Sequence, residues 1–316
     1  MGELRKDYFL DRFVIINPER AKRPHDFSHP PATLTKATVF APGNEKDLPP
    51  IIVQYPNNDQ WQFRVVPNKF AIVSPQGEPE LRTDKIFTFA SNYGHHEIVI
   101  EGREDAKPFS ALGPSGISQA LKVAIDRVIV LQNRPHIESV AYFKNEGPEA
   151  GASINHPHSQ IIAMSVVPAS LQRLFATHAQ LRSKFGFSPL YKILDHERGG
   201  PRIVAESKHF VLLCPYASRF PLEVMIIPLR DSPSYTTLTD EERDDLAQHL
   251  AHVLGKLSSL AAPFNVEWIH SKNNPQFHWY ASITPRLSIW AGYEIETNII
   301  VNPIPPEDAA AFYRAP

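Results

Sequence analysis

Two histidines on either side of a proline, His156-Pro157-His158, are the residues of this chain best suited to chemistry. Proline holds its own φ at about −65° and biases the residue before it towards an extended backbone. Residues two apart in an extended chain point to the same face, so both imidazoles are expected to address one cavity. A neutral imidazole is a nucleophile near pH 7, which makes covalent catalysis available to this motif.

The residues around the histidines are suited to binding phosphate. Gly147 and Gly151 leave backbone amides open to a ligand, and Asn145 and Ser153 add polar side chains. The apolar run 161–167 follows directly and is typical of a buried strand. Small residues, paired histidines and a strand indicate a phosphate cradle beside an imidazole. A histidine pair taken alone is more often structural or part of a metal site.

The stretch GASINHPHSQIIA, residues 151–163, resembles the active-site signature of the galactose-1-phosphate uridylyltransferase family in the histidine-triad superfamily. The resemblance implies that His158 attacks the α-phosphorus of UDP-glucose, releases glucose 1-phosphate and then passes the uridylyl group to galactose 1-phosphate. It also implies that the backbone carbonyl of His156 accepts a hydrogen bond from His158. Gln160 would donate to a non-bridging phosphate oxygen.

The same resemblance assigns substrate-binding residues outside the motif. In the family, a segment like RAKRP, residues 20–24, supplies arginines to the nucleotide, partly across a subunit interface. This implies a homodimer with shared active sites. The substrate-binding residues expected on this basis are Arg20, Arg23, Asn68, Asn145, Gly151, Ser153, Tyr293 and Asn298.

The metal sites of the family are degenerate in this chain. Many relatives carry two zinc-binding cysteines where this chain has Thr38 and Ala41, a further ligand place falls at Asp105, and only His156 remains. One imidazole and one carboxylate make a poor tetrahedral zinc site, so we expect neither zinc nor any other cofactor, and expect packing to hold the loop. His270 and His278 survive in the second half and are expected to make structural polar contacts.

Two other functions use the same sequence features. One is an ADP-sugar or dinucleoside tetraphosphate phosphorylase that works through the same histidine with inorganic phosphate as acceptor. The loss of metal ligands and the altered closing segment 289–294 favour this alternative. The other is a binding protein that senses nucleotides, against which the intact HPHSQ motif argues.

Composition narrows the partners and the compartment. The net charge of −2 over 316 residues gives no sign of a nucleic-acid partner, and no apolar run is long enough to span a membrane. The single cysteine, Cys214, excludes an intrachain disulfide and favours a cytoplasmic protein.

The pattern of expected elements predicts an α+β fold of two tandem histidine-triad-like modules with antiparallel sheets. Strands, one helix and two further strands occur twice, with helices over 114–132 and about 240–260. We place an N-terminal module with the HPHSQ site at residues 1–168 and a second module at 169–316. Residues 1–36 are expected to form an irregular arm apart from a short strand at 13–16.

Overall fold

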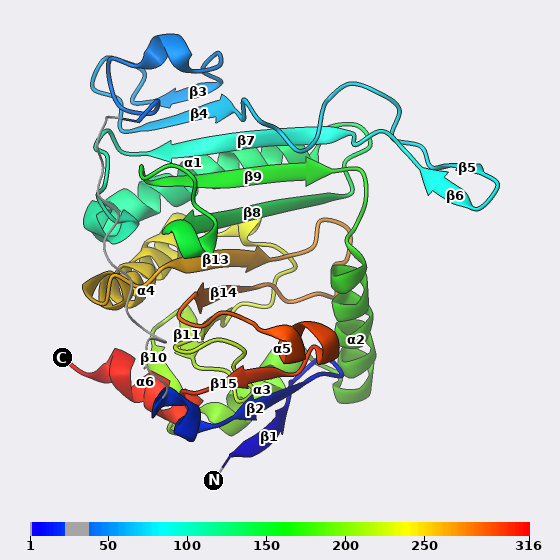
Figure 1. Cartoon of the computed structure of the whole chain (residues 1–316), viewed down its shortest axis with the longest axis vertical. Coiled ribbons are helices and arrows are strands. Elements are labelled where there is room, and N and C mark those ends of the chain that lie inside the picture. Colours follow the sequence, from blue (N-terminus) through cyan, green and yellow to red (C-terminus); the bar gives the residue numbers. More distant parts are fainter. Residues whose placement is uncertain (1, 23–37) are drawn as a thin grey trace.

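The computed structural model describes residues 2–22 and 38–316. Its centre is one antiparallel sheet of ten strands in the order β10-β11-β12-β14-β13-β8-β9-β7-β4-β3 (Figure 1). The expected α+β class with antiparallel sheets is confirmed. The strands of this sheet are β3 (Val53–Tyr55), β4 (Phe63–Pro67), β7 (Gly94–Glu101), β8 (Ser139–Glu146), β9 (His158–Met164), β10 (Ile203–Glu206), β11 (Phe210–Leu213), β12 (Val224–Pro228), β13 (Phe264–Ile269) and β14 (Tyr280–Pro285).

The strand order is mirrored about the pair β8–β13. Outward from this pair, β8 is followed by β9, β7, β4 and β3, and β13 is followed by β14, β12, β11 and β10. Phe264 pairs with Glu146 and Asn265 with Asn145, so the two halves join edge to edge in one continuous sheet. The mirrored order agrees with two related modules, and the boundary at residue 168 stays a proposal.

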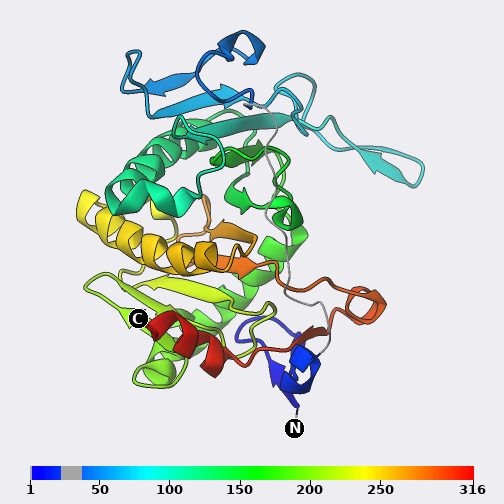
Figure 2. The ribbon, with the colours of Figure 1, turned by 60° about the vertical axis from the view of Figure 1, so that its left-hand side comes forward.

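Helices α1 (Gly113–Gln132) and α4 (Asp240–Ser259) pack together on one face of the sheet (Figure 2). Proline near the start of α1 suits the first helical turn, where its missing N–H costs nothing. The expected capping box of α4 is present, since Thr239 and Glu242 each accept from the other's backbone N–H. The buried side chains of both helices form the main core with alternate residues of the strands.

The opposite face is covered differently in the two halves. In the second half, α3 (Pro189–Glu197) covers Val211, Leu213 and Met225. In the first half none of the described helices lies over β9, and the small cluster around Phe40 and Trp61 packs on that face. The remaining helices are α2 (Ala169–Phe185), α5 (Gly292–Thr297) and α6 (Pro306–Arg314), with the 3-10 turns η1 (Pro18–Lys22), η2 (Glu45–Asp47), η3 (Phe109–Leu112), η4 (Pro148–Ala150) and η5 (Tyr235–Thr237).

The N-terminal segment is more regular than the sequence predicts. β1 (Glu3–Lys6) and β2 (Phe13–Ile16) form a hairpin, and β2 pairs in parallel with β15 (Ile300–Asn302) near the C-terminus. The expected strand at 13–16 is confirmed. The expectation of an irregular arm is wrong for residues 3–6, because pairing with another strand is invisible in local periodicity. The other small sheet is the hairpin of β5 (Arg82–Asp84) and β6 (Phe87–Phe89), which projects from the body (Figure 1). Among the described helices none is long and apolar enough to cross a membrane.

Candidate active site around His158

His158 is the first residue of β9, which lies between β7 and β8. Side chains alternate along the strand. Ser159 and Ile161 therefore face the helices, whereas His158 and Gln160 face the side that no helix of the described residues covers in this half. The predicted strand thus begins three residues earlier than expected and carries the histidine itself.

The ring of His158 is held in one tautomer. Its Nδ1 lies 2.7 Å from the backbone oxygen of His156, which can only accept, so Nδ1 carries the proton and Nε2 keeps its lone pair. Burial lowers the pKa of His158 to about 4, partly opposed by this hydrogen bond and reinforced by the Lys144 charge. The side chain therefore stays neutral at neutral pH, as a nucleophile requires.

The ring of His156 does not share the cavity of His158. Its Nδ1 lies 2.7 Å from Oδ1 of Asp105, and its Nε2 lies 3.1 Å from the backbone oxygen of Gly102. The prediction that both imidazoles address one cavity is therefore wrong for this ring, because the chain bends at His156 and becomes extended only at His158. His156 serves its neighbour through its carbonyl alone.

The residues at the family's zinc place do not fit a zinc ion. Thr38 donates from its backbone N–H and its hydroxyl to Asp105, at 2.8 and 2.5 Å. Although partial burial raises it, these bonds and those from His156 hold the pKa of Asp105 below its ordinary value. Both nitrogens of His156 face oxygen acceptors, and the described residues contain no group of three or more metal-ligating side chains. Polar contacts as well as packing against Phe40 hold this loop.

We predict that the purified protein contains no stoichiometric zinc, since a threonine hydroxyl and an alanine stand where thiolates would be needed. Elemental analysis of protein prepared without chelators checks this. A value near one zinc per chain would contradict the prediction and would require the Asp105–His156 contact to open.

A buried ion pair lies directly behind His158 on the helix side of the sheet. The ammonium of Lys144 lies 2.6 Å from Glu101 and 3.1 Å from the backbone oxygen of His158. Ser159 donates to the second oxygen of Glu101 at 2.5 Å. The side chains of Lys144 and Glu101 are only 4% and 0% exposed. The pair therefore binds the backbone of the histidine and the hydroxyl of the next residue at once.

Gln160 is held by a histidine of the neighbouring strand. His96 Nε2 lies 2.8 Å from Gln160 Oε1, and Asn68 Nδ2 lies 3.1 Å from the same ring nitrogen. Burial lowers the pKa of His96, so the ring is neutral. The structure thus brings Gln160 and Asn68 together through a third residue that the sequence did not assign to the site.

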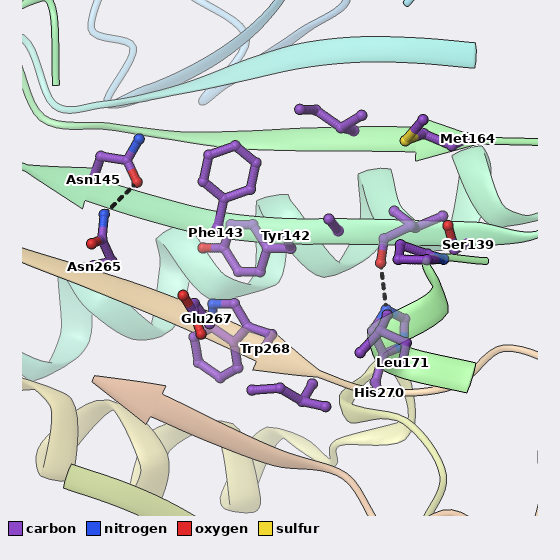
Figure 3. Close-up of a pocket in the computed structure, with 15 residues that line it drawn as sticks. Ser139, Tyr142, Phe143, Asn145, Met164, Leu171, Asn265, Glu267, Trp268 and His270 are labelled. Atoms are coloured by element: carbon purple, nitrogen blue, oxygen red, sulfur yellow. Dashed lines mark hydrogen bonds between the residues drawn. The ribbon is translucent and has the colours of Figure 1, made fainter. Parts of the chain in front are cut away.

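Asn145 lies on β8 beside the loop of residues 147–153, which we call the cradle loop. Its Oδ1 accepts from Asn265 Nδ2 at 2.8 Å (Figure 3). Gly151 follows η4 with φ of +89°, a backbone conformation that L side chains rarely adopt, and a Cβ there would lie 3.7 Å from Asn145 Nδ2. Ser153 is exposed on the same loop. The loop and Asn145 therefore face one another, as a phosphate cradle requires.

A cavity of about 330 Å³ opens on the same face of the sheet, over the pair β8–β13 (Figure 3). Asn145 and Asn265 lie at one end of it, and Glu267 in its floor is exposed. Apolar side chains make up most of the rest of its lining, among them Phe143, Ile162, Met164, Leu171, Trp268 and Ile269. Its size and its place beside Asn145 suit part of a small organic ligand.

The remaining predicted site residues lie elsewhere in the chain. Arg20 is on η1, and Tyr293 and Asn298 belong to α5 and its C-terminal cap. These elements lie beside the strands of the second half, away from the start of β9 (Figure 1). Arg23 lies outside the described residues. Within one chain the structure therefore does not bring these three described residues to His158.

His270 and His278 have the structural contacts that the sequence predicts. His270 bonds Val140 O at 2.9 Å and Ser234 Oγ at 2.9 Å. His278 bonds Pro228 O at 3.0 Å and Ser188 Oγ at 2.7 Å.

Sequence reasoning missed Glu101, Lys144, Asn265 and His96 as neighbours of the site. Glu101 and Lys144 stand at inward-facing positions of apolar strands. That was the available signal, because a charged side chain is buried in a core only together with a partner. Nothing local marked Asn265, which becomes a neighbour only through the β8–β13 pairing.

Comparison with known proteins places this geometry in a family. The model of the galactose-1-phosphate uridyl transferase N-terminal domain matches residues 4–168, and a domain of unknown function, DUF4921, matches residues 89–311. The chain is 33% identical to an ADP-glucose phosphorylase of Arabidopsis thaliana, over 99% of this chain and 92% of that protein. It is 26% identical to a galactose-1-phosphate uridylyltransferase of Thermotoga maritima, over 99% and 98%.

Solved structures agree with the sequence matches. A crystal structure of an ADP-glucose phosphorylase from Arabidopsis thaliana with bound ADP-glucose superposes with a TM-score of 0.85 at 29% identity, covering 100% of this chain and 99% of that chain. A uridylyltransferase structure at 22% identity, covering 99% and 97%, has a TM-score of 0.77 and shows the same fold. With the HPHSQ strand and its cradle in place, the chain belongs to the galactose-1-phosphate uridylyltransferase family of nucleotidyltransferases.

Proposed function

We propose that this protein transfers a nucleotidyl group from a nucleoside diphosphate glucose to a phosphate-bearing acceptor through a covalent bond to His158. The observation that carries the proposal is the 2.7 Å contact of His158 Nδ1 with the His156 carbonyl, which leaves Nε2 unprotonated on the face with the cradle. Gln160 and Asn145 lie on the same face and supply amide donors for phosphate oxygens.

The chemistry consists of two displacements at the α-phosphorus. His158 Nε2 forms a bond to phosphorus while the bond to the glucose 1-phosphate oxygen breaks, and that oxygen leaves with the electron pair. The acceptor phosphate then attacks the same phosphorus and the nitrogen–phosphorus bond breaks. The acceptor is already an anion, so the second step needs no general base, and the neutral nucleophile needs none in the first.

The donor base and the acceptor distinguish two candidates. Identity to the ADP-glucose phosphorylase, at 33%, exceeds that to the Thermotoga maritima uridylyltransferase, at 26%. Directly before the closing segment, Ser288 stands near the place where the family resemblance implies a lysine that touches the sugar phosphate. We therefore place adenylyl transfer from ADP-glucose to inorganic phosphate ahead of uridylyl transfer from UDP-glucose to galactose 1-phosphate, which the active-site signature alone predicts.

Product analysis of two parallel reactions tests this order. ADP-glucose with inorganic phosphate is expected to give ADP and glucose 1-phosphate, and UDP-glucose with galactose 1-phosphate is expected to react at least about tenfold more slowly. The reverse ratio would restore the uridylyltransferase as the function. Absence of turnover in both reactions would contradict the proposed function in either form.

The rate of nucleotidyl transfer is expected to stay high well below pH 6. Only neutral His158 is a nucleophile, and burial lowers its pKa to about 4, compared with about 6.5 for an exposed histidine. Between these values the unfolded chain takes up a proton at this residue and the folded chain does not, so the free energy of unfolding falls as the pH falls through that window. A pH profile of kcat/KM for the nucleotide sugar checks the expected rate below pH 6. A decrease of kcat/KM with a midpoint near pH 6.5 would contradict it.

A homodimer with shared sites is part of the proposal. Arg20, Tyr293 and Asn298 lie away from His158 in their own chain, so they are placed to reach a site only in a second chain. Several apolar side chains are exposed: Ile86 and Phe87 (87% and 64%) on the projecting hairpin, Phe70 (83%) on the loop before it, and Ile289 (90%) beside α5. Such residues on a soluble chain favour an interface.

Mixing of inactive variants tests the sharing of sites. His158→Ala and Arg20→Ala/Arg23→Ala are each expected to be inactive, and a heterodimer of the two is expected to regain one site with all its parts. Activity should partly return after subunit exchange. If exchange is verified by mass and activity stays at the level of the separate variants, the arginines act within their own chain.

A further inference from the structure

Two residues outside the predicted site control which atoms of Asn145 and Gln160 face the phosphates. We propose that Asn265 and His96 are positioning residues that bind the amide oxygens of Asn145 and Gln160 and so present both NH₂ groups to the nucleotide. The proposal rests on the proposed function.

The four residues lie on one face of adjacent strands. Asn265 of β13 pairs directly with Asn145 of β8. Phe143 of β8 pairs with Gln160 of β9, so the same register brings Asn145 opposite His158. Residues opposite one another in an antiparallel pair have Cβ atoms about 5 Å apart, which places both amides within reach of one phosphate group at His158.

The orientation of Asn145 is fixed by a backbone carbonyl. The same Nδ2 of Asn265 donates to Ala150 O at 2.8 Å and to Asn145 Oδ1 at 2.8 Å. A carbonyl oxygen can only accept, so the atom of Asn265 that faces Ala150 must be nitrogen. The atom of Asn145 that faces this nitrogen must then be oxygen. Asn145 Nδ2 is left towards Gly151, where the cradle loop lies.

The orientation of Gln160 is fixed by a backbone N–H. Ile72 N donates to His96 Nδ1 at 3.3 Å, so Nδ1 must be the unprotonated nitrogen of this neutral ring. His96 Nε2 then carries the proton and donates to Gln160 Oε1 at 2.8 Å. The NH₂ group of Gln160 is thereby turned away from His96.

A third contact bears on this tautomer. Asn68 Nδ2 lies 3.1 Å from His96 Nε2, and a donor there favours the opposite tautomer. That tautomer would set the Nδ1 proton against the Ile72 N–H and turn the Gln160 oxygen towards the phosphates. The Ile72 N–H is fixed by the backbone and would lie against a proton on Nδ1. Asn68 Oδ1 accepts from Phe70 N at 2.8 Å, which turns the Asn68 NH₂ towards His96, but this NH₂ lies farther from Nε2, at 3.1 Å, than Gln160 Oε1 does, at 2.8 Å. The geometry therefore favours the first tautomer.

The chemical consequence is electrostatic. An amide that turns its NH₂ to a phosphate oxygen stabilises charge on it, and a reversed amide opposes that charge with its own oxygen. Because both amides are already oriented before a ligand arrives, binding needs no reorganisation of these groups. Removal of Asn265 or His96 should therefore lower kcat/KM only when the amide that it orients is present.

Double-mutant cycles test this dependence. Asn265→Leu is expected to lower kcat/KM about tenfold in the otherwise natural chain but less than about threefold in Asn145→Ala, since residues in contact are coupled and distant ones are additive. His96→Phe should behave in the same way towards Gln160→Leu. The crossed pairs, Asn265→Leu with Gln160→Leu and His96→Phe with Asn145→Ala, should each be closer to additive.

A matched control separates positioning from loss of fold. Asn302 is a buried asparagine whose Nδ2, like that of Asn265, donates to two acceptors, here the backbone oxygens of Ser218 and Phe220, at 2.9 and 3.1 Å. Asn302→Leu is expected to lower the melting temperature and to show no coupling to Asn145→Ala. Equal coupling in this control would mean that the cycles report stability.

The same cycles can be measured with the dissociation constants of ADP and of UDP, which do not depend on turnover. If the protein turns over neither nucleotide sugar, the proposed function fails, while the binding cycles still decide the roles of Asn265 and His96. If turnover is found and both cycles are additive in kcat/KM and in nucleotide affinity, the positioning roles are refuted.

Discussion

Replacement of His158 by alanine is expected to abolish nucleotidyl transfer while leaving the fold intact. Removal of a catalytic nucleophile commonly lowers kcat by about 10⁴-fold or more. The side chain lies at the start of β9 on the face that none of the described helices covers in this half of the sheet, and its one described hydrogen bond is to the carbonyl of His156. The measurement is turnover of ADP-glucose and UDP-glucose, with circular dichroism and the melting temperature recorded for the same preparation.

A second variant shows whether the loss belongs to the nucleophile. His270→Ala removes a histidine that is buried to the same extent, 6% exposed in both cases, and that bonds two structural partners. This variant is expected to lose stability and to keep the capacity for covalent transfer. If His158→Ala retains ordinary turnover, His158 is not the nucleophile.

Removal of one partner of the buried pair Lys144–Glu101 is expected to have the largest effect on stability. Lys144→Met leaves the Glu101 carboxylate buried without its cation, at a cost of about 3–5 kcal/mol in the free energy of unfolding. It also removes the bond to the His158 carbonyl, so nucleotidyl transfer should decrease in the fraction that remains folded. Denaturant unfolding followed by fluorescence measures the change in the free energy of unfolding.

Two further variants serve as controls for this prediction. The double variant Lys144→Met/Glu101→Met should recover most of the lost stability, because replacement of a whole buried pair by apolar side chains is often neutral. Lys122→Ala breaks an exposed pair with Asp126 and should cost less than about 1 kcal/mol. A single variant at Lys144 as stable as the natural chain would contradict the role assigned to the pair.

The parts of the fold that local patterns determine could be predicted from the sequence. The periodicity of 114–132 and the capping box at Thr239 identified the two long helices, and the apolar run after His158 identified β9. The contact between His158 and the His156 carbonyl, which the resemblance of the HPHSQ motif implies, is present, and both residues lie within three positions of one another. These features depend on neighbours in sequence, which a single chain displays directly.

The parts that depend on pairing between distant segments could not be predicted. Strand β2 is ordered by β15, nearly 290 residues later in the chain, and Asn265 reaches Asn145 only because β13 pairs with β8. The turn of the His156 ring towards Asp105 likewise depends on the loop that carries Thr38. Arg20 and Tyr293 matched family positions in sequence, yet one chain keeps both away from His158.

The intact mass of the protein after incubation with one nucleotide sugar and no acceptor tests the central claim most directly. With ADP-glucose, the mass should increase by one adenylyl group, and peptide mapping should place that group on His158. Addition of inorganic phosphate should remove it and release ADP. An adduct on His158 with UDP-glucose alone would make the donor uridylyl. No adduct with either nucleotide sugar, or an adduct on another residue, would contradict the covalent mechanism.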